Sequence, residues 1–170
     1  EIIKGAAGVP SPQLTADGKV EFGVVGGDQV LTMRAQGAPL VALYASFKTF
    51  PRGFVVHDAN PVKDLAGLWN SGSTVAVEPG LPFVKWLNHK YAKGTPRLVA
   101  SQGGLAGFIR DPALSQAVFV FSEPVELKQR KVPVRTLRVA DSGYNPYSVV
   151  VATSESFLSE NEDVARRFVR

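Results

Sequence analysis

Apolar residues along this chain alternate between short continuous runs and stripes at helical spacing. Short apolar runs bounded by glycine, proline and polar residues predict strands. Between such runs, Phe83, Leu87 and Tyr91 recur at i, i+4 and i+8, which predicts the buried stripe of a helix. Since strands alternate with helices, we expect an α/β fold in which mainly parallel sheets are flanked by helices. The predicted strands are residues 1–4, 20–25, 40–47, 53–56, 73–77, 97–100, 117–121, 132–139 and 148–153.

Capping residues predict where several helices begin and end. Asp28 is expected to be the N-cap of a helix that runs to Gln36, just before a glycine. A final helix is expected to open at a capping box formed by Ser159 and Glu162, whereas residues 5–12 are expected to form a loop. Other helical segments are expected at residues 60–65, 83–91 and 105–110 and from residue 122 onward.

Two irregular stretches divide the chain, one near residues 57–61 and one near 143–148. A chain that leaves one αβ unit, completes a second and then returns predicts two lobes joined by two crossovers. We expect the first lobe to comprise residues 1–57 and 148–170, and the second lobe to comprise residues 58–147. Ligands of open α/β sheets bind beyond the carboxyl ends of the strands, so both lobes are expected to direct those ends at a shared cleft.

Composition and charge narrow the classes of function. Of the 170 residues, 45% are hydrophobic and 20% are charged, and no apolar run approaches the ~20 residues that cross a bilayer. The net charge is +4, but the basic residues are scattered and do not alternate with aromatic residues, so nucleic acid is not an expected partner. The chain has no cysteine, and His57 and His89 have no ligand partners at metal spacing, so neither a metal nor another cofactor is expected.

A family resemblance runs through seven segments of the chain. They are residues 20–31, 34–42, 63–67, 75–80, 122–124, 141–147 and 157–170. In this order they resemble the solute-binding proteins of ABC importers, in the branch for sulfonates, nitrate, riboflavin and thiamine-type pyrimidine precursors. The resemblance implies a two-lobed type II periplasmic-binding-protein fold. It also implies a monomer that closes its lobes on a small-molecule solute and delivers it to a membrane permease, in the periplasm or anchored outside the cytoplasmic membrane.

Two departures from the family pattern affect this expectation. Family members begin with a strand upstream of the position that matches Ile2 and continue for several helices beyond Arg170, so the chain is expected to lack those parts. At Gly80-Leu81-Pro82, relatives that bind oxyanions often carry serine or threonine. Without those hydroxyls, a flat, neutral solute such as a pyrimidine or a flavin is favoured over a sulfonate or nitrate.

Candidate ligand-binding residues follow the strands or lie in the second crossover. Glu123, at a helix start, is a candidate acceptor for a ring N–H of the solute, or else an ordinary first-turn acid. Tyr144 and Tyr147 are candidates to stack on a flat ring and Asn145 to bond its edge, or else these residues pack the crossover and form a turn. Capping of a helix and packing of the core are the alternatives for Asp28 and the phenylalanines. The full set is Gly27, Asp28, Phe47, Gly80, Phe83, Gln102, Ser122, Glu123, Tyr144, Asn145 and Tyr147.

Catalysis is not expected. A related enzyme family with this fold makes the thiamine pyrimidine and carries a cysteine-rich motif, but this chain has no cysteine. It also has no Ser/His/Asp arrangement and no phosphate loop. Two other interpretations stay open, because the extracytoplasmic sensing domain of a receptor and a truncated fragment that no longer binds would show the same pattern.

Overall fold

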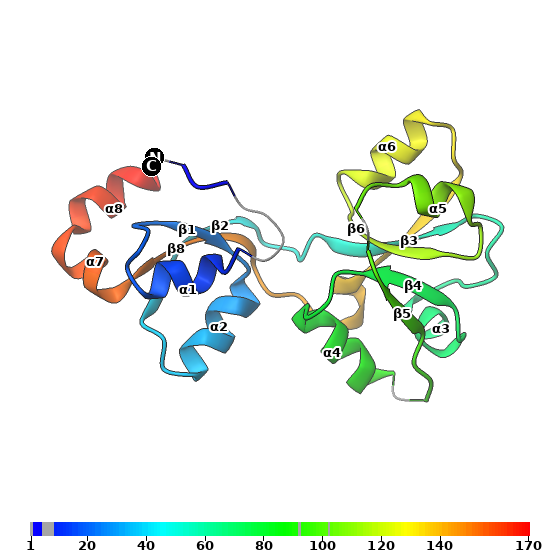
Figure 1. Cartoon of the computed structure of the whole chain (residues 1–170), viewed down its shortest axis with the longest axis horizontal. Coiled ribbons are helices and arrows are strands. Elements are labelled where there is room, and N and C mark those ends of the chain that lie inside the picture. The colour runs from blue at the N-terminus through cyan, green and yellow to red at the C-terminus, as the bar shows by residue number, and fades with distance from the viewer. Residues whose placement is uncertain (1, 5–8, 92, 102) are drawn as a thin grey trace. The chain divides into compact units, whose positions relative to one another are not determined.

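Two compact units make up the structure, which is a computed structural model (Figure 1). Unit 1 consists of Glu1–Thr49 and Pro146–Arg170, and unit 2 consists of Phe50–Asn145. The chain therefore leaves unit 1 once and returns to it once. The residues that the structure describes are 2–4, 9–91, 93–101 and 103–170.

Unit 1 is built on a three-stranded antiparallel sheet with the strand order β1-β8-β2. The returning strand β8 lies in the middle, so the two parts of unit 1 are joined by backbone hydrogen bonds on both of its sides. The strands are β1 (Gly23–Val25), β2 (Leu40–Phe47) and β8 (Ser148–Ser154). One face of this sheet is buried against helices α1 (Ser11–Ala16) and α2 (Gly27–Ala35), and its core consists of Val25, Val30, Leu40, Val150 and Ala152.

Two short helices follow β8, namely α7 (Glu155–Glu160) and α8 (Glu162–Phe168). Phe22, which precedes β1, connects them through its ring. The ring stacks on Phe168 with 4.0 Å between centroids and meets Phe157 edge-on at 5.4 Å. These aromatic contacts fasten the end of the chain to the start of the sheet of unit 1.

Unit 2 is built on a five-stranded mixed sheet with the order β5-β4-β6-β3-β7. Strand β4 runs parallel to β5 and β6, whereas β3 runs antiparallel to β6 and β7. The strands are β3 (Arg52–His57), β4 (Thr74–Val77), β5 (Arg97–Ala100), β6 (Ser115–Phe119) and β7 (Val134–Arg138). The helices are α3 (Leu65–Asn70), α4 (Pro82–Lys90), α5 (Ala106–Arg110) and α6 (Glu123–Gln129), and a 3-10 helix, η1, spans Val139–Ser142.

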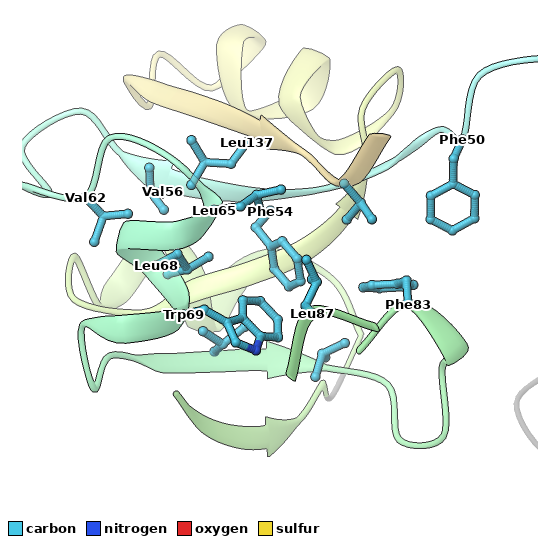
Figure 2. Close-up of a cluster of buried hydrophobic side chains, with 13 residues drawn as sticks. Phe50, Phe54, Val56, Val62, Leu65, Leu68, Trp69, Phe83, Leu87 and Leu137 are labelled. Atoms are coloured by element: carbon cyan, nitrogen blue, oxygen red, sulfur yellow. The ribbon is translucent and has the colours of Figure 1, made fainter. Parts of the chain in front are cut away.

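Helices cover both faces of the sheet in unit 2. Along β3, Phe54 and Val56 point into one apolar cluster and Val55 points into the other, as alternate residues of a strand must. The larger cluster contains Leu68 and Trp69 of α3 and side chains of α4 (Figure 2). The smaller cluster is Val55, Leu105, Phe108, Val118 and Leu127, which come from β3, β6, α5, α6 and the residue before α5. Because β3 is buried from both sides, it reads as a continuous apolar run in the sequence.

The predicted α/β class is confirmed, since both sheets are flanked by helices, but the strand directions are more mixed than the sequence predicted. In the described part of the chain, parallel pairing is confined to β4 and its two neighbours. The sequence prediction also placed residues 53–57 in the first lobe. In the structure these residues belong to β3 and pair with β6 and β7, because their apolar side chains complete both cores of unit 2.

Helix capping differs from the prediction at two places. The N-cap of α2 is Gly26 and not Asp28, because Gly26 has the extended backbone of a cap while Asp28 is already helical. The side chain of Gln29 accepts a hydrogen bond of 2.8 Å from the N–H of Gly26. Ser159 lies inside α7, whose own cap is Ser154, and the last helix, α8, has Asn161 as its N-cap residue. The predicted capping box therefore does not form.

The first described residues also differ from the prediction. Residues 2–4 form no strand, and Ile2 is 96% exposed, since no described strand lies beside them. The predicted loop at residues 5–12 ends in a helix, because α1 begins there. In α1, a proline occupies the first turn, where its missing N–H costs nothing, and the hydroxyl of Thr15 donates to the carbonyl of Ser11 at 2.9 Å.

Candidate functional site

The candidate ligand site lies at the edge of unit 2 where its parallel strands end. Strands β4, β5 and β6 end at Val77, Ala100 and Phe119, and the antiparallel strand β3 begins at the same edge with Arg52, which lies opposite Phe119. Ligands of open α/β sheets bind beyond this edge. We call it the carboxyl edge of unit 2.

Three side chains form a charged and aromatic cluster at the carboxyl edge. The guanidinium of Arg52 lies over the ring of Phe119, with Cζ 3.8 Å from the centroid, and its Nη1 is 3.3 Å from Oε2 of Glu78. The side chain of Arg52 is 18% exposed and that of Glu78 is 54% exposed. No pattern in the sequence predicted this cluster. Its signal was a single arginine directly before the buried run of β3.

Glu123 and Ser122 are brought to the same edge by the turn from β6 into α6. One carboxylate oxygen of Glu123 accepts a 3.0 Å hydrogen bond from the backbone N–H of Phe119, so the side chain closes its own turn. Ser122 is exposed and is the N-cap residue of α6. Phe121 is 50% exposed, and its ring centroid lies 5.5 Å from that of Phe119. The edge therefore combines an aromatic surface with groups of both charges.

Gly80 lies at this edge too, in the segment between β4 and α4. It is exposed and has a positive φ of +82°, a conformation that glycine adopts without strain. Gln102 was predicted from the corresponding segment after β5, but it lies outside the described residues. The prediction for Gln102 therefore stays a prediction.

Phe83 and Tyr144 belong to an aromatic group that leads from the core to the surface. Phe83 is 1% exposed and packs edge-on against Phe50 at 5.7 Å, so the structure places it in the core (Figure 2). The half-buried ring of Tyr144 lies 5.1 Å from that of Phe50 and 6.0 Å from that of Trp86, which is 39% exposed. Of the aromatic residues in this group, Trp86 is the most exposed.

Asn145 has a definite structural partner. Its side-chain oxygen accepts a 2.7 Å hydrogen bond from the backbone N–H of Phe50. These two residues are the last and the first of unit 2. The bond therefore joins the two chain segments that connect unit 2 to the rest of the protein.

The remaining predicted residues lie in unit 1, around the start of α2. The N–H of Gly27 donates to the carbonyl of Tyr147 at 3.0 Å, and a Cβ on Gly27 would lie 2.5 Å from the same oxygen. Tyr147 is 59% exposed, and the next residue pairs with Phe47 of β2. Asp28 is half-buried and accepts the N–H of its neighbour at 2.9 Å. The structure thus brings Gly27, Asp28, Phe47 and Tyr147 into one region of unit 1, and their role in binding a solute stays a prediction.

Two open hollows occur elsewhere on unit 2, with volumes of about 400 and 350 Å³. Neither is lined by a predicted site residue. Tyr91, beside Asp64 in the second hollow, is a titratable group whose environment has a clear effect. Burial raises the pKa of Tyr91 above its ordinary value, and the negative charge of Asp64 adds to the rise.

The described residues contain neither a cluster of metal-ligating side chains nor a membrane-spanning helix. Within them, His, Cys, Asp and Glu nowhere gather in threes at a spacing that suits a metal ion. Every described helix is too short or too polar to cross a bilayer.

Comparison with known families and proteins adds sequence evidence. Residues 1–93 and 105–170 match the family described as "NMT1/THI5 like". The chain is 27% identical over 158 residues to the riboflavin-binding protein RibY of Chloroflexus aurantiacus. This alignment covers 89% of the chain and 44% of RibY. The chain therefore spans less than half the length of this curated relative.

Solved structures with the same fold include two named binding proteins. The periplasmic aliphatic sulphonate binding protein SsuA of Escherichia coli superposes with a TM-score of 0.68 at 18% identity, over 92% of this chain and 55% of SsuA. The glycine/betaine/L-proline-binding protein ProX of Borrelia burgdorferi gives a TM-score of 0.65 at 16% identity, over 89% of this chain and 63% of ProX. At these identities the likeness concerns the fold, which is the predicted type II periplasmic-binding-protein fold.

Proposed function

Because the chain belongs to the NMT1/THI5-like family, we propose that it is the solute-binding part of an ABC importer. In this role it acts outside the cytoplasmic membrane, captures a small molecule and presents it to a membrane permease. The named relatives are binding proteins and not enzymes, which supports binding without catalysis.

The observation that carries the proposal is the chemistry of the carboxyl edge of unit 2. Phe121 and Glu78 are exposed there, and Arg52 and Glu123 are within reach of solvent. An edge that served only to terminate the sheet would not need a cation, two carboxylates and two aromatic rings side by side. Hydrogen-bonding groups placed among apolar surface are typical of small-molecule sites.

A flat heterocycle is the solute class that we favour, and a flavin is preferred over a pyrimidine. The exposed ring of Phe121 suits stacking on a flat solute. Residues 80–82 contain no hydroxyl group to meet an oxyanion, which makes a sulfonate or nitrate a weaker candidate. The relative RibY is a riboflavin-binding protein by name, which supports the flavin. Closure of the lobes on the solute stays a prediction from the family resemblance.

The proposal is tested by thermal unfolding of the chain against riboflavin, thiamine, its pyrimidine precursors, taurine and nitrate. A solute present at 100 times its dissociation constant stabilises the folded state by about 2.7 kcal/mol, which raises the melting temperature by several degrees. We expect the largest rise with riboflavin. Cooperative melting that is unchanged by every compound would contradict the proposed solute class.

A further inference from the structure

The cluster of Arg52, Phe119 and Glu78 has a feature that packing alone does not explain. A guanidinium carries five N–H donors, and the ion pair with Glu78 brings Nη1 of Arg52 to 3.3 Å from Oε2. Among the described residues, Glu78 and the ring of Phe119 are the partners of the Arg52 side chain, and no backbone carbonyl accepts from it. Among the described residues, Glu78 is therefore the acceptor that this cation, 18% exposed, meets at the carboxyl edge.

The two partners hold Arg52 with different firmness. The guanidinium of Arg52 lies over the ring of Phe119, with Cζ 3.8 Å from the ring centroid, and this contact limits the positions that its N–H groups can take. Glu78 is 54% exposed, and ion pairs with so exposed a partner add little stability because water and salt screen them. Glu78 is therefore the partner that another acceptor displaces most readily, while Phe119 keeps Arg52 oriented.

We infer that Arg52 is the residue that determines which solute binds. Glu78 is the acceptor that pairs with Arg52 until a solute takes its position. The inference rests on the proposed function, because it assigns a role within that solute site. A guanidinium fork held over an aromatic ring recognises two acceptors side by side on a flat group. The solute is therefore a planar ring that presents such a pair, either a carbonyl oxygen beside a ring nitrogen or a carboxylate.

This chemistry separates the candidate solutes. The ring system of riboflavin presents a carbonyl oxygen next to an unprotonated nitrogen along its edge, which fits the fork of Arg52. Thiamine carries a positive charge, which Arg52 repels, and its amino group is a donor where an acceptor is needed. The cluster therefore favours a flavin and disfavours thiamine at this edge.

The test measures the affinity of riboflavin for the whole chain, with nicotinate as the planar carboxylate and thiamine and taurine as comparisons. We expect Arg52→Gln to weaken riboflavin binding about 10- to 100-fold, the range for loss of hydrogen bonds from a charged donor. Arg52→Lys keeps the charge but loses the fork, so its loss is intermediate. Glu78→Gln removes the competing carboxylate and tightens binding about 2- to 5-fold.

A second ion pair in unit 2 provides matched controls. Arg130, the C-cap residue of α6, and Glu126 within α6 form an exposed ion pair with 2.6 Å between Nη2 and Oε1. Arg130→Gln and Glu126→Gln are therefore expected to leave riboflavin affinity unchanged. Tighter nicotinate than riboflavin binding, lost in Arg52→Gln, would assign the carboxylate rather than the neutral edge. Tryptophan fluorescence during urea unfolding shows whether each variant is folded. If Arg52→Gln does not fold, the riboflavin affinity of Glu78→Gln tests the inference instead.

Several results would overturn the inference. An affinity that is equally unchanged in Arg52→Gln and Arg130→Gln would overturn it. A Glu78→Gln variant that weakens binding as much as Arg52→Gln does would make the pair structural. If thiamine or taurine binds with the same affinity to Arg52→Gln as to the unmodified chain, the inference is overturned. The proposed transport function would still stand. If no compound in the panel binds the unmodified chain, the proposed solute class is contradicted, and the inference falls with it.

Discussion

The two units differ in how their sheets are covered. In unit 2, side chains of β3 are buried on both faces, and the described residues form clusters of thirteen and five buried apolar side chains. In unit 1, the described core is one cluster of five. On the opposite face of that sheet, Val24, Val151 and Tyr44 lie in one cross-strand row, in which Val24 is 62% and Tyr44 is 53% exposed.

This difference indicates which of the described side chains have well-packed elements to hold them in a fixed geometry. Side chains at a binding site keep their geometry only when the elements that carry them are packed. The carboxyl edge of unit 2 is carried by strands with cores on both faces, so Arg52 and Phe119 start from well-supported positions. The region around Gly27 and Tyr147 in unit 1 has the smaller core behind it.

The largest expected effect comes from removing the ring of Phe54 in unit 2. It is fully buried and meets Trp69 edge-on at 5.3 Å and Phe83 at 6.0 Å. Phe54→Ala is expected to lower the free energy of unfolding by about 3–5 kcal/mol, through lost burial and the cavity left behind. Both tryptophans of the chain, Trp69 and Trp86, lie in unit 2, so their fluorescence during urea unfolding measures this loss.

The matched control for Phe54→Ala is Val125→Ala. Val125 is 50% exposed on α6, and its truncation is expected to change the free energy of unfolding by less than about 0.5 kcal/mol. A cost near 1 kcal/mol for Phe54→Ala would show that the core of unit 2 is loosely packed, and the contrast between the units would lose its basis.

A smaller effect is expected from the core of unit 1. Leu40 is fully buried there, and Leu40→Ala is expected to cost about 2–4 kcal/mol. Amide hydrogen exchange of β2 and β8 should report this loss, while the tryptophan signal of unit 2 keeps its midpoint. Leu31→Ala is the control, since Leu31 is 68% exposed on α2. An equal shift of the tryptophan midpoint in Leu40→Ala would show that the units unfold together.

The smallest effect concerns the close approach of Gly27 to the carbonyl of Tyr147. A Cβ at 2.5 Å from a backbone oxygen forces the start of α2 to move, so Gly27→Ala is expected to cost about 1–2 kcal/mol in unit 1. Gly107→Ala is the control in unit 2. Gly107 lies in helix α5 with open space around it, and alanine there is expected to stabilise by about 0.5–1 kcal/mol. Equal effects of the two changes would contradict the close approach.

Much of the fold could be predicted, because burial leaves a direct pattern in the sequence. The apolar runs at β2, β3, β4 and β8 correspond to the observed strands, and the stripe of Phe83 and Leu87 is buried as expected. Helix ends were harder to predict, since the N-caps of α2 and α8 are Gly26 and Asn161, whereas Asp28 and Ser159 look like better caps in the sequence. Strand direction depends on connections between distant segments, and no local pattern encodes it.

The site could be predicted only as far as strand ends indicate it. Residues that follow strands, such as Glu123 and Gly80, do lie at the carboxyl edge. Arg52 was missed because it is the first residue of an antiparallel strand, and the rule of carboxyl ends does not include such residues. Phe83 was chosen by position, but its ring lies in the core, which the helical stripe also indicated.

The hydrogen bond between Asn145 and Phe50 has a consequence for how the chain is organised as a gene product. Unit 2 begins and ends at two residues that are held together at 2.7 Å. It is therefore an insertion, which means a segment that a host chain accepts at one point of its sequence. Since the first and last residues of the segment are bonded to each other, the host residues on either side of the insertion stay close together. Such a segment can be moved between scaffolds, or circularly permuted by joining those residues through a short linker, at little cost in loop-closure entropy.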